Sequence, residues 1–89
     1  RAGLVLLDFS RALAAVSAVG TYGANKYSDS GWLYVQDGER RYTDAMMRHL
    51  LEEGAGNRFD PESELLHAAH VAWNALARLE LALRSLDRI

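Results

Sequence analysis

The feature that most constrains the fold of this sequence is an apolar seam with helical spacing in its last third. Alternating steps of four and three residues connect Leu65, Ala69, Ala72, Leu76, Leu79, Leu83 and Leu86. Such a seam is typical of a helix that packs against other helices. Asp60 and Pro61 precede it, and these residue types favour the N-cap and the first helical position. We therefore expect a long helix over about residues 61–86, with Asp60 as its N-cap.

Two further helices are predicted upstream, and the alternation typical of strands is nearly absent. The first covers about residues 9–22, and its stripe contains Gly20 and Gly23, small residues that would let another backbone approach closely. The second covers about residues 40–53 and stops at the glycines of "GAG". Residues 1–89 are expected to form a single all-α domain, a small bundle of three main helices.

Composition limits the partners that the protein can have. Hydrophobic residues make up 49% of 89 residues, and there is no cysteine to form a disulfide. A helical domain this small often completes its core by self-association, so we expect a homo-oligomer. The net charge is −2 and no basic stripe is present, so duplex nucleic acid is not an expected partner. The longest apolar stretch, "GLVLL", is too short to span a bilayer, and we expect no membrane partner and a cytoplasmic location.

A polar stripe lies opposite the apolar seam on the last predicted helix. It consists of Ser63, His67, His70, Asn74 and Arg78. A stripe that faced water would be expected to carry Glu, Lys and Arg rather than His and Asn. Two histidines at i and i+3 can reach one metal ion or one phosphate group, and they can equally be ordinary polar residues of a helix surface.

The segment between the first two predicted helices carries Tyr27, Trp32 and Tyr34, which is unusual for a loop. Exposed aromatic side chains on a loop are typical of a binding surface. The alternative is that these rings fold back and cap the core. The sequence leaves both interpretations open.

Three segments taken in order resemble a known family. "TYGANKYSDSGW", "RRYTDAMMRHL" and "DPESELLHAAHVAWNAL" are similar to motifs of the mostly phage-borne dATP/dGTP diphosphohydrolase family, and the resemblance covers about residues 8–82. That family is akin to the MazG-like all-α nucleotide pyrophosphohydrolases, which are helical, oligomeric and magnesium-dependent. They split a nucleoside triphosphate into a monophosphate and pyrophosphate. For a phage protein, the cytoplasm would be that of the host cell.

The resemblance also implies a set of functional residues. Phosphate oxygens would be held by Lys26, Arg41 and Arg48, while Tyr27 or Trp32 would stack on the base and Asn74 would contact the ligand. A divalent ion, Mg²⁺ or Mn²⁺, or the attacking water would be positioned by Asp44, Glu62, His67 and His70. His49 would be a further catalytic residue, and Asp60 also belongs to the matching motif.

The chain departs from the family pattern at three places. Ser30 and Gly31 precede Trp32, where asparagine alone is usual. Glu64 stands where glycine is usual, and His67 and His70 stand where the MazG-like enzymes carry a downstream pair of acidic magnesium ligands. Histidine is a poor ligand for Mg²⁺, which prefers carboxylate and water oxygens. Either another metal serves, or carboxylates come from elsewhere, or nucleotides are bound without being cut.

Three functions therefore remain open from the sequence. The first is a metal-dependent pyrophosphohydrolase acting on purine deoxynucleoside triphosphates. The second is a non-catalytic sponge that sequesters a nucleotide signal of bacterial immunity, such as a cyclic nucleotide or an ADP-ribose derivative. The third is a structural helical module without a ligand.

Overall fold

The computed structural model describes residues 1–87 and confirms the all-α class. Its elements are α1 (Gly3–Leu6), α2 (Ser10–Lys26), the 3₁₀ helix η1 (Gly31–Tyr34), α3 (Gly38–Gly54) and α4 (His67–Leu86). Extended pairing within these residues is limited to an isolated antiparallel bridge between Phe59 and Leu66. None of the described helices is long and apolar enough to cross a bilayer.

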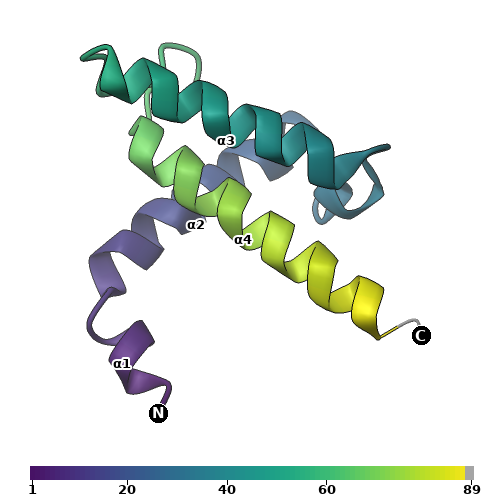
Figure 1. Cartoon of the computed structure of the whole chain (residues 1–89). Helices are drawn as coiled ribbons and strands as arrows, with labels where there is room; N and C mark the ends of the chain where they lie inside the picture. The colour runs from purple at the N-terminus through teal and green to yellow at the C-terminus, as the bar shows by residue number, and fades with distance from the viewer. Residues whose placement is uncertain (88–89) are drawn as a thin grey trace.

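Two long helices form the centre of the molecule. α3 and α4 run antiparallel and lie against each other, joined by the loop of residues 55–66 (Figure 1). α2 packs across α4, while the short α1 projects away from the other helices and contacts α2 (Figure 1). The loop of residues 55–66 therefore returns the chain so that the end of α3 and the start of α4 are neighbours.

The predicted start of the last helix was wrong. α4 begins at His67, and Asp60 does not cap it. Instead, the Asp60 carboxylate accepts a hydrogen bond from the Ser63 backbone amide at 2.8 Å, and the Asp60 carbonyl accepts one from the Glu64 amide at 2.8 Å. These bonds close a single turn, and the bridge between Phe59 and Leu66 closes the loop around it. An aspartate before proline suits a short turn as well as a helix, which is why the sequence pattern was ambiguous.

The turn ends at a strained residue, and this yields a prediction. Glu64 has φ +64°, the left-handed region that costs an L-residue roughly 1–2 kcal/mol. Glu64→Gly is expected to raise the free energy of unfolding by about 1 kcal/mol, measured by urea denaturation. Glu64→Ala is the matched control, because it removes the same carboxylate but keeps the Cβ atom. Equal stability of the two variants would contradict the strain.

Three aromatic rings fill the space between η1, α3 and α4. Trp32, Tyr42 and Trp73 meet edge to face, with ring centroids 5.5–6.2 Å apart. The Tyr42 hydroxyl also donates to the Trp32 carbonyl at 2.6 Å. Of the three loop aromatics, Trp32 thus folds back onto the core, whereas Tyr27 and Tyr34 remain exposed.

The small residues of α2 have different surroundings. A Cβ atom on Gly20 would lie 3.4 Å from Trp73 Nε1, so Gly20 admits a close approach of α4. The approaching group is a side chain rather than the backbone that the sequence pattern predicted. A Cβ atom on Gly23 would meet nothing within 4 Å.

The apolar seam of α4 is largely uncovered by the rest of the chain. Its four leucines, Leu76, Leu79, Leu83 and Leu86, are 48–65% exposed. The buried residues of α4 are instead His67, His70 and Asn74, together with the small residues Ala69 and Ala77. The chain exposes 6774 Å² of accessible surface. A folded monomer of 9.9 kDa is expected to expose about 5,200 Å². The excess, roughly 1,600 Å², exceeds the roughly 800 Å² that each partner buries in a standard interface.

Candidate functional site

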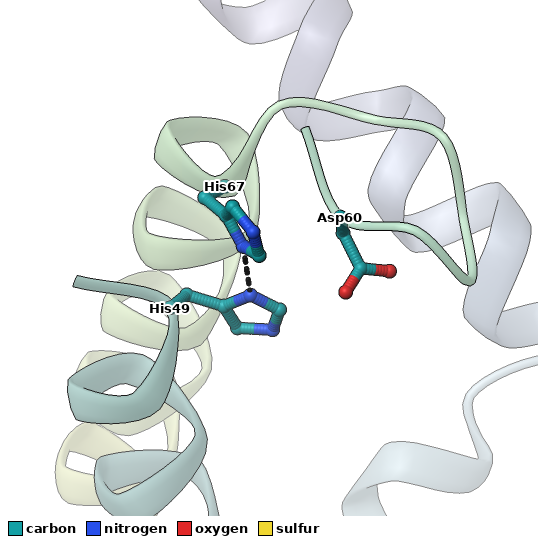
Figure 2. Close-up of side chains that lie close together, drawn as sticks. All are labelled: His49, Asp60 and His67. Carbon is teal, nitrogen blue, oxygen red and sulfur yellow. Dashed lines mark hydrogen bonds between the residues drawn. The ribbon is translucent and has the colours of Figure 1, made fainter. Parts of the chain in front are cut away.

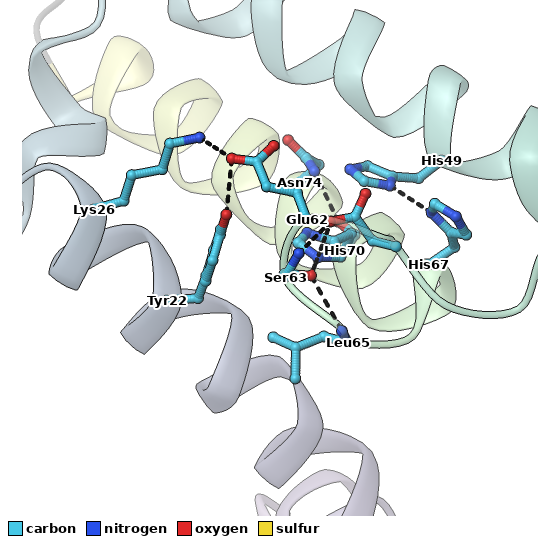
Figure 3. Close-up of polar contacts among 10 residues, drawn as sticks. Tyr22, Lys26, His49, Glu62, Ser63, Leu65, His67, His70 and Asn74 are labelled. Atoms are coloured by element: carbon cyan, nitrogen blue, oxygen red, sulfur yellow. Dashed lines mark hydrogen bonds and ion pairs between the residues drawn. The ribbon is translucent and has the colours of Figure 1, made fainter.

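The polar interior of the molecule is built around three histidines. His49, near the end of α3, is 5% exposed, and His67 and His70, in the first turn of α4, are 2% and 8% exposed. The Nδ1 atoms of His49 and His67 lie 2.8 Å apart, and the rings of His49 and His70 stack with centroids 4.4 Å apart (Figure 3). The antiparallel pairing of α3 and α4 brings these rings together, although 18 residues separate His49 from His67.

A carboxylate joins the histidines from the preceding turn. Asp60 Oδ2 accepts the Ser63 backbone amide at 2.8 Å and lies 4.0 Å from His70 Nε2. The Ser63 hydroxyl is hydrogen-bonded to the same His70 nitrogen at 2.7 Å. Ser63 therefore contacts both groups and holds the carboxylate beside the imidazoles.

Three of these side chains are close enough to share an ion. His49, Asp60 and His67 each offer one ligand atom, and the three atoms lie within 4.8 Å of one another. Figure 2 shows the two imidazoles joined by their hydrogen bond, with the Asp60 carboxylate facing them from the loop. Within residues 1–87 this is the group of His, Asp and Glu residues that meets the geometry of a metal site. We call His49, Asp60, His67 and His70 the histidine–aspartate cluster.

The protonation of the cluster suits ligand binding. Burial, together with the neighbouring His70 and the charge of Arg48, lowers the pKa of His49 to about 4. Burial also lowers the pKa of His70. Both rings are therefore neutral at pH 7, the form in which imidazole binds metals. Burial opposes ionisation of Asp60, but the hydrogen bonds from Ser63 outweigh it and leave the Asp60 pKa below its usual value.

A charged rim lies beside the cluster, on α2 and the turn. Glu62 Oε1 accepts a hydrogen bond from the Tyr22 hydroxyl at 2.9 Å and forms an ion pair with Lys26 (Figure 3). The hydrogen bond to Glu62 raises the pKa of Lys26 to about 12. The Tyr22 ring contacts His70 edge to face, with centroids 6.5 Å apart. Tyr22 thus connects the exposed Lys26 and Glu62 to the buried histidines.

The other functional residues that the resemblance implied differ in their burial and in their contacts. Asn74 is buried, and its side-chain amide donates to the His70 carbonyl at 2.8 Å. Tyr27 is exposed, with its ring 5.4 Å from the Lys26 ammonium. Trp32 packs in the aromatic cluster described above. The exposed residues of α3 include Arg41, Asp44 and Arg48.

Only some of the ion ligands that the resemblance implied lie together in the structure. The resemblance pointed to Asp44, Glu62, His67 and His70, but Asp44 is exposed and Glu62 is engaged by Lys26 and Tyr22. The carboxylate that joins the histidines is Asp60, which sequence reasoning explained as a helix cap. The signal for Asp60 was present in the "DPES" motif, while its proximity to His49 depends on tertiary structure.

Comparison with known proteins decides the family. The family model described as "dATP/dGTP diphosphohydrolase, N-terminal" matches residues 1–88. The chain belongs to this family. No curated protein and no solved structure matches it significantly. The histidine–aspartate cluster and the rim therefore lie within the residues that the family model matches.

Proposed function

We propose that the protein binds purine deoxynucleoside triphosphates and hydrolyses them, with a divalent ion, to the monophosphate and pyrophosphate. The observation that carries this proposal is the buried histidine–aspartate cluster in a chain of the dATP/dGTP diphosphohydrolase family. Burying imidazoles and an ionised carboxylate in a small core costs free energy, and groups of this kind cluster at functional sites.

The rim supplies groups that suit a triphosphate. The ammonium of Lys26 forms charge-assisted hydrogen bonds with phosphate oxygens once the ligand displaces Glu62. Arg48 adds positive charge next to the cluster, since its charge is felt at both His49 and His70. The exposed ring of Tyr27 can stack on a base beside Lys26.

The cluster supplies groups that suit hydrolysis. A divalent ion bound there would offset charge on phosphate oxygens and make water a better nucleophile. The neutral His70 can accept a proton from an attacking water, and its hydrogen bond to Ser63 fixes the ring. Asn74 holds the carbonyl of His70 and so stabilises the first turn of α4.

The test is incubation with dGTP and dATP, with and without Mg²⁺, Mn²⁺ or Zn²⁺, followed by measurement of pyrophosphate. The expected result is metal-dependent release of pyrophosphate that EDTA abolishes. Cyclic and ADP-ribose-type nucleotides are included as non-substrates. Absence of pyrophosphate with every ion would overturn the proposed activity.

A second candidate is sequestration of a nucleotide signal without cleavage. One observation favours it: the ion-binding group contains a single carboxylate, and histidines replace the acidic pair of the MazG-like enzymes. In that case a cyclic or ADP-ribose-type nucleotide would bind tightly and be recovered unchanged after denaturation of the protein.

The proposed role of Lys26 gives a prediction. Lys26→Met is expected to raise the KM for dGTP about tenfold, since a hydrogen bond to a charged group contributes about 1.5–3 kcal/mol and Glu62 offsets part of it. Steady-state kinetics of pyrophosphate release measure this effect. Arg11→Met is the matched control, because Arg11 is another exposed cation of α2. Similar KM values for both variants would remove Lys26 from the phosphate site.

The uncovered seam supports a homo-oligomer, with a second copy of the chain as the partner. The excess surface of roughly 1,600 Å² is sufficient for a stable dimer. Light scattering is expected to give at least twice the chain mass. Leu79→Lys is expected to lower the mass to that of a monomer, and Ser85→Lys, also on exposed surface of α4, is expected to leave it unchanged. A monomeric unmodified protein would contradict this arrangement.

A further inference from the structure

We propose that His49, Asp60 and His67 bind a divalent transition-metal ion, with Zn²⁺ preferred over Mg²⁺. The catalytic role of this ion rests on the proposed function, whereas its binding can be measured without any nucleotide.

The first support is the convergence of three separate segments on one point. His49 comes from the end of α3, His67 from the first residue of α4, and Asp60 from the turn between them. The ligand atoms of all three lie within 4.8 Å of one another. Two nitrogens bound to one tetrahedral ion at about 2.0–2.1 Å lie about 3.3–3.4 Å apart. The facing Nδ1 atoms, at 2.8 Å, would therefore move apart by about 0.5 Å to bind one ion together.

The second support is an unsatisfied atom inside the cluster. His67 is 2% exposed, and its Nε2 atom is buried without a hydrogen-bond partner among the described residues. A buried polar atom left unpaired costs about 1–3 kcal/mol, and such atoms often mark the place of an ion or water. The other nitrogen of the same ring, Nδ1, faces His49. An ion bound through Nε2 would satisfy the unpaired atom and leave the contact with His49 in place.

The third support is the chemistry of the donors. Two imidazole nitrogens and one carboxylate oxygen form a set typical of Zn²⁺ and related transition metals. Three protein ligands leave a position for water or a phosphate oxygen, as in catalytic rather than structural sites. Mg²⁺ requires mostly oxygen ligands, and the group offers it one carboxylate.

Ser63 is the positioning residue of this site. Its backbone amide holds one oxygen of Asp60, and its hydroxyl is bonded to His70, whose ring stacks on His49. Ser63 thus fixes the carboxylate and, through His70, one of the imidazoles. Partners of this kind typically change metal affinity 10–100-fold.

The test is metal binding by the EDTA-treated protein without nucleotide. After addition of Zn²⁺, Mn²⁺ or Mg²⁺ and gel filtration, the metal content is measured by mass spectrometry and the melting temperature by calorimetry. We expect about one Zn²⁺ per chain, a raised melting temperature and Zn²⁺ affinity at least about 100-fold above that for Mg²⁺. Co²⁺ is a spectroscopic probe, and its visible absorption is expected to report nitrogen ligation.

Substitutions distinguish the proposed ligands, which include Asp60, from the set implied by the resemblance, which includes Asp44. His67→Ala and Asp60→Asn are expected to weaken Zn²⁺ binding at least about 100-fold, and Ser63→Ala about tenfold. Asp44→Asn is the matched control for Asp60→Asn and is expected to leave Zn²⁺ affinity unchanged. Circular dichroism without metal checks folding, and Ser63→Ala provides the test if the ligand variants do not fold.

Two results would overturn the proposal: no retained Zn²⁺, or Zn²⁺ binding that depends on Asp44 and not on His67 or Asp60. Failure of the two proposals is distinguishable. Zn²⁺ binding without pyrophosphate release would remove the proposed activity only. Pyrophosphate release together with Zn²⁺ binding that Asp60→Asn and His67→Ala both leave intact would remove the ligand assignment only.

Discussion

Replacing His67 with alanine is expected to reduce metal-dependent pyrophosphate release from dGTP at least about 100-fold, the effect of losing about 3 kcal/mol of transition-state stabilisation. His67 is the most buried side chain of the cluster and faces His49 at 2.8 Å. Its removal takes away one of two imidazole donors and leaves His49 without its hydrogen-bond partner. Steady-state rates at saturating metal measure the loss.

A control must separate chemistry from folding. Leu66→Ala truncates the partly exposed side chain immediately before His67. It leaves the four side chains of the histidine–aspartate cluster unchanged. Its rate per folded molecule is expected to stay close to that of the unmodified protein. A His67→Ala variant that is folded and retains full activity would exclude the histidine–aspartate cluster as the reaction centre.

Acid is expected to destabilise the metal-free protein by about 2 kcal/mol between pH 7 and pH 5. Burial lowers the pKa of His49 from 6.5 to about 4 in the folded state. Below pH 6.5 the unfolded chain therefore binds a proton that the folded chain does not. The stabilising contribution is fully present above pH 6.5 and is lost as the pH falls towards 4. His70 shifts in the same direction, while Asp60 has a lowered pKa that affects stability only below its usual value of 3.8.

Urea denaturation in EDTA at several pH values measures this loss. His49→Gln removes the titrating ring, so its free energy of unfolding is expected to depend less on pH over the same range. An identical pH dependence of the variant and the unmodified protein would mean that His49 does not carry the effect.

Much of the fold followed from local patterns in the sequence. Helical periodicity predicted three long helices, and glycine after the second marked its end. The start of the last helix was misplaced because Asp60 and Pro61 favour a tight turn and a helix N-terminus equally. The left-handed conformation of Glu64 belongs to that same turn.

The packing direction of the last helix was harder to predict. Its leucine seam carried the strongest periodic signal, yet the leucines from Leu76 onward are exposed. The chain buries His67, His70 and Asn74 of the opposite face. Periodicity identifies an apolar face but does not say whether it meets the same chain or another molecule. The polar stripe was recognisable because His and Asn are unusual on a face that meets water.

The candidate site was partly visible for a similar reason. The spacing of His67 and His70 placed them on one face of a helix, since residues three apart are neighbours there. Their contact with His49 arises from the crossing of two helices, and the position of Asp60 arises from a turn. Neither contact can be read from spacing along the chain.

Anomalous X-ray diffraction from crystals grown with Zn²⁺ tests the central claim most directly. We expect one strong peak per chain, within bonding distance of His49, Asp60 and His67. A peak held instead by Asp44 or Glu62, or an empty cluster at saturating Zn²⁺, would contradict the claim.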